Sequence, residues 1–141
     1  MGTLIDSTLW VDYFRAKTPN AVKEQVVSVV NEPDAVLCHP VRFEILRAAL
    51  RSERRLIEEA FATIPLVSSP PDLWEQSALL GQRCLDAGFR PPPIDLLIAQ
   101  VSLHHDLEIA TFDQHFSEVA KTCRLKVRLL VRAIPNPKSK I

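Results

Sequence analysis

Four carboxylates in this sequence stand at positions from which they could act together as ligands of a cation. Asp6 and Asp113 each follow a short apolar run, and Asp95 and Glu44 each lie near the start of a predicted helix. Four carboxylates in one cleft repel one another and do not all stay ionised without a cation. Hard ions such as Mg²⁺ and Mn²⁺ prefer oxygen ligands. Two such ions about 3.5–4 Å apart can activate a water and stabilise a leaving oxygen in phosphodiester hydrolysis.

Each of these acids also has an ordinary structural interpretation. An Asp after a strand is a common turn residue or helix N-cap, and this applies to Asp6 and Asp113. Asp95 could complement the dipole of its own helix or cap it. Glu44 could form an exposed pair with Arg47, which would stabilise the helix by roughly 0.2–0.5 kcal/mol. The sequence leaves these alternatives open, but the convergence of four acids favours a cation site.

The helix predicted over 93–105 gives the clearest sign that one of the acids points inward. Because each residue of a helix turns by about 100°, Asp95 lies about 140–180° away from Gln100 and His104, which mark the polar side. The rest of this helix is apolar nearly all round, so we expect it to be buried. Asp95 is therefore a carboxylate on a face that should point into the molecule.

Short apolar runs alternate with longer helical segments along the chain. Five runs predict strands: Thr3–Ile5, Ala35–Cys38, Ile64–Val67, Leu107–Phe112 and Val127–Val131. Helices are predicted over 8–15, 20–31, 40–62 with a break near Ser52, 72–87, 93–105 and 114–120. This alternation is typical of a mostly parallel sheet covered by helices on both faces. Because ligands bind at the carboxyl ends of such strands, Asp6 and Asp113 are expected at the binding edge.

The composition indicates one ordered domain in which charge is unevenly distributed. The chain has 141 residues, of which 47% are hydrophobic and 24% are charged, so a disordered chain is excluded. Basic and acidic side chains number 17 each, which taken alone argues against a polyanion-binding protein. Residues 121–141, however, hold seven of the basic side chains and no acid, so residues 1–120 carry a net charge of −7. We expect a domain over 1–132 and a basic tail over 133–141. The basic segment 121–141, together with Arg47 and Arg51, could offer phosphates a place to bind.

The cysteines and the apolar segments indicate a cytoplasmic protein. Cys38, Cys84 and Cys123 show no C-x-x-C spacing, which argues against a disulfide framework or a zinc site and fits a reducing compartment. The N-terminus lacks the charged segment and apolar run of a signal peptide. No stretch reaches the roughly 18 apolar residues of a membrane span, so we expect no membrane partner.

Four segments around the acids resemble the motifs of the PIN-domain ribonucleases, in particular the VapC-type toxins of bacterial toxin–antitoxin modules. The segments are Leu4–Phe14 around Asp6, Val41–Leu46 around Glu44, Pro92–Ala99 around Asp95, and Leu107–Phe116 around Asp113. Each segment is a weak match alone, whereas their order and spacing together are specific. The resemblance covers roughly Leu4 to Val131. It implies a PIN-like three-layer α/β/α sandwich with a central, mostly parallel five-stranded sheet.

The resemblance also implies a role for each residue of the site. The metal-binding and catalytic acids would be Asp6, Glu44, Asp95 and Asp113. Thr111 matches a position whose hydroxyl orients the carboxylates, and Ser7 matches a small polar position beside the first acid. Many relatives carry a further Asp near the position of His115, which could instead contact substrate, cap or pack. Candidate substrate contacts are Ser7, Arg15, Arg47, Arg51 and His115, the arginines because paired donors suit phosphate, although they could equally be solvated surface.

The implied activity is that of a metal-dependent endoribonuclease, with Mg²⁺ or Mn²⁺ as cofactor and a metal-activated water as nucleophile. The implied partners are the RNA substrate, a VapB-like antitoxin protein and a second copy of the chain in a homodimer. Two alternatives remain: an RNA-processing PIN nuclease without an antitoxin, and a phosphoryl-transfer enzyme with Asp6 as nucleophile. The latter chemistry usually has a second acid two residues on, where Thr8 stands. A binding module without catalysis is disfavoured because all four acids are present.

Overall fold

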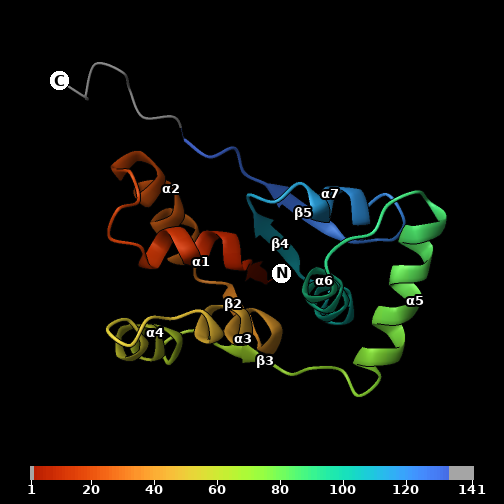
Figure 1. Cartoon of the computed structure of the whole chain (residues 1–141), viewed down its shortest axis with the longest axis horizontal. Helices are drawn as coiled ribbons and strands as arrows, with labels where there is room; N and C mark the ends of the chain where they lie inside the picture. Colours follow the sequence, from red (N-terminus) through yellow and green to blue (C-terminus); the bar gives the residue numbers. More distant parts are fainter. Residues whose placement is uncertain (1, 134–141) are drawn as a thin grey trace.

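A five-stranded sheet with all its strands parallel forms the centre of the computed structural model, which describes residues 2–133 (Figure 1). The strands lie in the order β3-β2-β1-β4-β5. They are β1 (Thr3–Ile5), β2 (Ala35–Cys38), β3 (Leu66–Val67), β4 (Glu108–Thr111) and β5 (Lys126–Leu129). The five predicted strands and the parallel sheet are thus confirmed. β3 is shorter than predicted and begins only after Pro65, which has no N–H to donate to a neighbouring strand.

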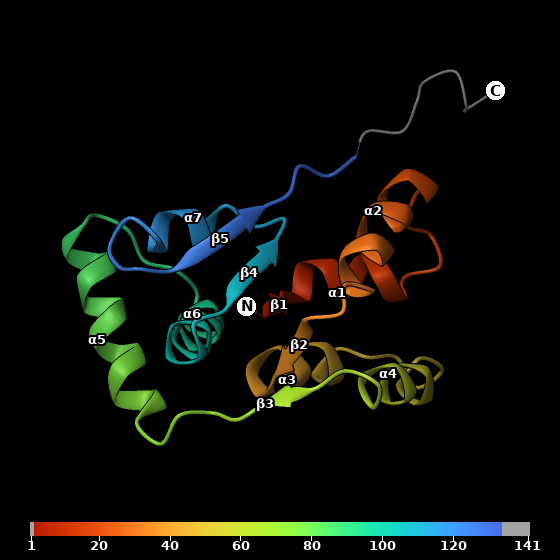
Figure 2. The same ribbon diagram turned by 180° about the vertical axis from the view of Figure 1, so that it is seen from behind.

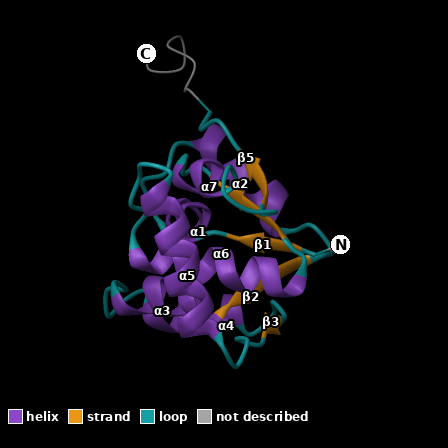
Figure 3. Ribbon diagram, turned by 90° about the vertical axis from the view of Figure 1, so that its right-hand side faces the viewer, coloured by secondary structure: helices purple, strands orange, loops and turns teal. Residues whose placement is uncertain are grey.

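Helices cover both faces of this sheet. Figures 1 and 2 show α1 (Ser7–Phe14), α2 (Asn20–Val30) and α4 (Arg54–Phe61) on one side, and α5 (Leu73–Asp86), α6 (Pro93–His105) and α7 (His115–Val119) on the other. α3 (His39–Arg47) contacts both α1 and α6. Figure 3 looks onto the α5 side and shows the strands among these helices. The three-layer arrangement agrees with the one expected from the sequence.

The order of the strands creates a crevice between β1 and β4. The chain runs outward from β1 to β2 and β3, and then crosses back to place β4 on the other side of β1. The connections that follow β1 and β4 therefore leave in opposite directions. In open parallel sheets, such a switch point is where ligands bind, at the carboxyl ends of the strands. Ile5 lies beside Ala110 in the register, so the residues that follow these two strands meet at this crevice.

The segment predicted as one broken helix over 40–62 is two helices joined by a longer turn. α3 already ends at Arg47. The N–H of Leu50 donates to Glu53 Oε1 at 2.9 Å, and the N–H of Glu53 donates to the carbonyl of Leu50 at 2.8 Å, which closes the turn. Arg51 consequently lies in this exposed turn and does not continue the helical stripe on which Arg47 lies.

Aromatic side chains fasten α1 to α4. Trp10 is fully buried, and its ring centroid lies 5.0 Å from that of Phe61 in an edge-to-face arrangement. The ring of Phe14 stacks on Trp10 with centroids 5.7 Å apart. Such pairs stabilise a fold by roughly 0.5–1.5 kcal/mol beyond the burial of their area. The cluster therefore gives α1 a fixed position relative to the start of the sheet.

Ion pairs explain the uneven distribution of charge along the chain. Arg128 on β5 pairs with Glu32 at 2.7 Å and with Glu108 at 2.8 Å, and it holds the pKa of Glu32 below its usual value. Arg132 pairs with the buried Asp12 on α1 at 2.9 Å. These ion pairs thus hold the basic C-terminal segment against acidic residues of the domain. Because Arg128 and Arg132 are already paired, they are not available to phosphate in the way that the sequence suggests. The predicted tail, 133–141, lies outside the described residues from position 134 onward.

Two further findings concern the helices and the cysteines of the described residues. Within residues 2–133, no helix is long and apolar enough to cross a membrane. The thiols of Cys38, Cys84 and Cys123 are all free. Burial raises the pKa of the Cys38 thiol to about 12, so this thiol stays protonated and unreactive near neutral pH.

Candidate active site

Asp6, the first of the four acids, follows β1 directly and caps the N-terminus of α1. Its side chain is only 2% exposed, and it accepts hydrogen bonds from the hydroxyls of Thr8 at 2.9 Å and Thr111 at 2.7 Å. It also accepts the backbone N–H of Thr8, as a helix N-cap does. Burial raises the pKa of Asp6, whereas these hydrogen bonds lower it. Asp6 therefore caps α1, as its structural interpretation predicts, and this cap also brings its carboxylate to Thr111 at the end of β4.

Thr111 links Asp6 to Asp113. This residue ends β4 and is fully buried. Its hydroxyl donates to Asp6 and accepts the backbone N–H of Asp113 at 2.8 Å. This is the geometry that the orienting role implied by the resemblance requires. The hydroxyl donates its one hydrogen bond to Asp6 and accepts one from the N–H of Asp113. It therefore holds the Asp6 carboxylate and the turn at Asp113 in one arrangement.

Thr8 is a residue of the site that the sequence did not single out. Its hydroxyl donates to Asp6 and accepts the N–H of Phe112 at 3.1 Å, so it joins the end of β1 to the end of β4. In the sequence, the one signal for Thr8 is its position two residues after Asp6, which follows a predicted strand. That signal marks a cap region, but it does not reveal the contact with a strand a hundred residues later.

Glu44 reaches the site from α3. It is half-buried, and it accepts a hydrogen bond from the hydroxyl of Ser7, which also lies 3.3 Å from Asp6 Oδ1. The exposed pair with Arg47 that the sequence allowed is not what engages this carboxylate. Glu44 is held next to the first acid because α3 packs against α1.

Asp95 lies in the first turn of α6 and points inward, as the helical periodicity predicts. Pro93 stands at the start of this helix, where its missing N–H is not needed. The side chain of Asp95 is 7% exposed. Burial, followed by the nearby charges of Asp6, Asp113 and Glu44, raises its pKa to about 7. An acid that merely complemented a helix dipole would have a lowered pKa. Asp95 therefore lies close enough to the other three predicted acids for their charges to act on it, and the space among the four carboxylates is the cleft.

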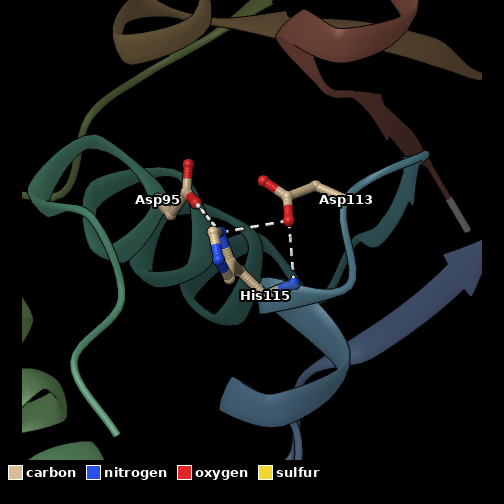
Figure 4. A group of neighbouring side chains, drawn as sticks. All are labelled: Asp95, Asp113 and His115. Atoms are coloured by element: carbon tan, nitrogen blue, oxygen red, sulfur yellow. Dashed lines mark hydrogen bonds and ion pairs between the residues drawn. The ribbon is translucent and has the colours of Figure 1, made fainter.

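His115 lies against two of these acids. Its Nδ1 atom is 3.1 Å from Asp113 Oδ1 and 3.4 Å from Asp95 Oδ2, as Figure 4 shows. The backbone N–H of His115 donates to the same Asp113 oxygen at 2.9 Å. The sequence placed this residue among possible substrate contacts, whereas the structure directs its ring at the carboxylates.

The residues of this cleft fit a divalent cation. The four acids supply oxygen atoms, which hard divalent ions prefer. The pKa of Asp95 is raised first by burial and then by the charges of Asp6, Asp113 and Glu44, although His115 lowers it. Asp95, Asp113 and His115 each offer a ligand atom within 4.8 Å of one another. A cation bound there would relieve the repulsion among the acids.

A hollow of about 640 Å³ opens beside the cleft, between α1, α3 and α4. Ser7 and Glu44 form the side of this hollow that faces the acids, and Arg15 and Arg47 also line it. Much of the remaining lining is apolar: Val11, Phe14, Ile45, Ala48, Ala49, Leu50 and Ile57. Arg51 is exposed in the turn between α3 and α4, so of the three predicted phosphate contacts the structure brings Arg15 and Arg47 to the site.

Replacing Thr111 by Val tests the link between the two strand-end acids. We expect Thr111→Val to weaken Mg²⁺ binding about 10–100-fold, because Asp6 and Asp113 lose the hydroxyl that orients them. Thr111→Ser keeps the hydroxyl and should bind as the wild type does. Titration calorimetry measures both affinities. The matched control is Thr63→Val, which removes an exposed hydroxyl bonded to the carbonyl of Ala60. Equal Mg²⁺ affinity in Thr111→Val and wild type would contradict the orienting role.

The fold and the cleft together define a class: an α/β protein with acids from β1, α3, α6 and the loop after β4 gathered at the switch point of a parallel sheet. The model of the PIN domain family matches residues 3–122. The chain therefore belongs to the PIN domain family.

Two curated relatives match most of the chain. VapC ribonuclease Mb1587 of Mycobacterium bovis is 29% identical over 133 residues, which cover 87% of this chain and 95% of the relative. Ribonuclease VapC11 of Mycobacterium tuberculosis matches with the same identity and coverage. Both alignments cover most of this chain and nearly the full length of the relative.

Solved structures share the fold at low sequence identity. The structure of VapBC-1 from nontypeable Haemophilus influenzae matches with a TM-score of 0.69 and 15% identity, covering 92% of this chain and 98% of that chain. The DNA-bound VapBC from Salmonella typhimurium matches with a TM-score of 0.71 and 14% identity, covering 91% and 97%. FitAB bound to an IR36 DNA fragment gives a TM-score of 0.70 at 16% identity, covering 90% and 94%.

Proposed function

We propose that this protein is a divalent-metal-dependent endoribonuclease and the toxin of a toxin–antitoxin pair. The observation that carries the proposal is the convergence of Asp6, Glu44, Asp95 and Asp113 in one cleft, where burial and mutual repulsion raise the pKa of Asp95. Membership of the PIN domain family and relatives named VapC ribonucleases support it.

The residues of the cleft divide the work of such a reaction between them. Bound Mg²⁺ or Mn²⁺ would lower the pKa of a water and offset charge on the phosphate. Asp6, Glu44, Asp95 and Asp113 would hold the cation. The hydroxyls of Ser7, Thr8 and Thr111 keep the carboxylates oriented through the hydrogen bonds described above. Arg15 and Arg47, which line the adjoining hollow, would bind phosphates on either side of the cut.

The phosphoryl-transfer alternative fits this geometry less well. This chemistry usually has a second acid two residues after the nucleophile, and Thr8 stands there instead. The hydroxyl of Thr8 donates to Asp6 Oδ2 at 2.9 Å, so this position holds the first carboxylate and supplies no second one.

A cleavage assay on total RNA tests the proposed function. The purified chain is incubated with Mg²⁺, with Mn²⁺, or with EDTA, and the cut ends are mapped by sequencing. We expect discrete internal cuts with either ion and none with EDTA. Cleavage that persists in EDTA, or intact RNA under every condition, would overturn the proposal. A small neighbouring antitoxin gene distinguishes a toxin from an RNA-processing nuclease.

The hollow between α1, α3 and α4 is our proposed site for the antitoxin. Solved structures with this fold include complexes whose names give both a VapB and a VapC component. The hollow has an apolar floor and ends at Glu44, so it suits an amphipathic segment that carries a basic side chain at one end. A partner seated there would cover Arg15 and Arg47 and reach the cleft, and so would block substrate.

A second, smaller hollow is our proposed homodimer contact. Its volume is about 390 Å³, and none of its lining residues is Asp, Glu, Lys or Arg. Phe43 and Trp74 line it and are 58% and 71% exposed, respectively. An uncharged surface can pair with its own copy about a two-fold axis without electrostatic cost. This surface is built from other residues than the first hollow, so both partners could be bound at once.

Trp74→Glu tests this contact. We expect the substitution to weaken self-association about 30-fold or more, since a buried aromatic anchor typically contributes about 2 kcal/mol or more. Sedimentation equilibrium measures the dissociation constant. Leu79→Glu, a substitution of another exposed apolar residue on α5 that does not line the hollow, is the control. A monomeric wild type, or unchanged association in Trp74→Glu, would contradict the assignment.

We also propose that the protein acts in the cytoplasm and that residues 133–141 form a basic tail on a domain of residues 1–132. Three free thiols are compatible with a reducing compartment. Packed contacts reach the last described residue, because the N–H of Ala133 donates to Gln25 Oε1 at 3.0 Å. Arg132 belongs structurally to the domain because it pairs with Asp12 at 2.9 Å, and Ala133, the first residue of the proposed tail, is still held by the domain.

A further inference from the structure

The imidazole ring of His115 is in direct contact with two of the four acids. Its Nδ1 atom faces Asp113 Oδ1 at 3.1 Å and Asp95 Oδ2 at 3.4 Å, and Figure 4 shows the ring directed at both carboxylates. The turn after β4 fixes this placement, since Asp113 Oδ1 also accepts the backbone N–H of His115. One side chain from α6 and two from the segment after β4 thus converge on a single point.

Two of the separations among these atoms, 3.1 and 3.4 Å from the imidazole nitrogen to the carboxylate oxygens, are close to those of neighbouring ligands on one octahedral ion. A metal–ligand distance of about 2.1 Å places adjacent octahedral ligands about 3 Å apart. The imidazole nitrogen and one oxygen from each carboxylate could therefore occupy one face of the coordination sphere, and all three atoms lie within 4.8 Å of one another.

The chemical type of the third donor has a consequence for the choice of ion. Mg²⁺ is a hard ion that prefers oxygen, whereas an imidazole nitrogen binds first-row transition ions more strongly. We propose that His115 Nδ1 is a direct metal ligand alongside Asp95 and Asp113 and that it makes this site prefer Mn²⁺ to Mg²⁺. The inference rests on the metal site of the proposed function and deepens it by assigning a nitrogen ligand. Asp6 and Glu44, the other two acids of the site, offer oxygen donors only.

Mn²⁺ is the probe that tests this ligand directly. Electron spin-echo envelope modulation of the full chain loaded with Mn²⁺, without RNA, detects ¹⁴N coupled to the ion. We expect the nitrogen signal in the wild type and in His104→Ala, whose ring contacts His105 on α6 and lies outside the acid cluster. We expect the signal to be absent from His115→Ala and from His115→Asp, which restores an all-oxygen donor set.

Titration calorimetry with each ion gives the second readout. We expect the preference for Mn²⁺ over Mg²⁺ to fall at least about tenfold in His115→Asp, while Mg²⁺ binding is retained. A wild type that binds no Mn²⁺, or that shows no nitrogen signal, would overturn the proposal, as would an equal preference in wild type and His115→Asp. Because RNA is absent, a chain that shows the nitrogen signal but cuts no RNA refutes only the proposed function. A chain that cuts RNA without the signal refutes only the nitrogen ligand.

Discussion

Asp95→Asn is expected to abolish metal-dependent RNA cleavage, lowering kcat/KM about 10³-fold or more, while the fold stays intact. Asparagine has nearly the same volume but no charge, so the cleft loses one anionic ligand from its buried side. Asp6→Asn should have a similar effect, and asparagine caps a helix about as well as aspartate does, so α1 keeps its start. Cleavage rates on a defined RNA, measured with saturating Mg²⁺ and with Mn²⁺, give the comparison.

Asp72→Asn is the matched control for these two variants. Asp72 stands before α5, is exposed, and makes no capping hydrogen bond with its side chain. The Asp72→Asn variant should therefore cleave RNA as the wild type does. Full activity in Asp95→Asn or Asp6→Asn would show that the acid concerned is not part of the active site. Loss of activity together with loss of the folded circular dichroism spectrum would instead point to a structural role.

In the absence of metal, the protein is expected to become less stable as the pH rises from about 4 to about 7. The pKa of Asp95 is raised in the folded state to about 7, from 3.8. Below pH 4 the carboxyl is protonated in both states and makes no difference. Between these values the unfolded chain loses the proton while the folded chain keeps it, which favours unfolding. Above pH 7 the full penalty applies, and we expect roughly 2–4 kcal/mol from this group.

Urea unfolding in EDTA at several pH values measures this effect. Asp95→Asn should flatten the dependence and be more stable than the wild type at pH 8, because it removes a buried charge and the repulsion of that charge with the other three acids. Adding Mg²⁺ should stabilise the wild type at pH 8 far more than Asp95→Asn. An Asp95→Asn variant several kcal/mol less stable than the wild type in EDTA would mean that this carboxylate stabilises the helix instead.

The parts of the site that sequence could predict depend on local periodicity. Asp6 and Asp113 were placed at the binding edge because each follows an apolar run, and runs that alternate with helices form parallel sheets. The inward orientation of Asp95 follows from the 3.6-residue repeat of an almost wholly apolar helix. Each of these predictions needs only the residues of one element, so the single sequence sufficed.

The remaining parts depend on contacts between distant segments. Glu44 is held by Ser7 because α3 packs on α1, and no repeat within either helix indicates this contact. The hydroxyl of Thr8 accepts the backbone N–H of Phe112 after β4, and no pattern within either segment indicates this contact. The basic C-terminal residues were expected to be available to phosphate, because sequence shows which charges are present but not which of them pair. Arg128 and Arg132 are paired in the fold.

The position of β1 has a consequence for when the protein becomes active during its synthesis. β1 is the first strand to be made, yet it lies between β2 and β4, and β4 begins at Glu108. The hydroxyl that orients Asp6 is 105 positions further along the chain. Such long-range contacts form slowly and only after the later segment has left the ribosome. A nascent or prematurely terminated chain therefore lacks a complete catalytic centre, and the translating cell meets the active nuclease only once nearly the whole protein has been released.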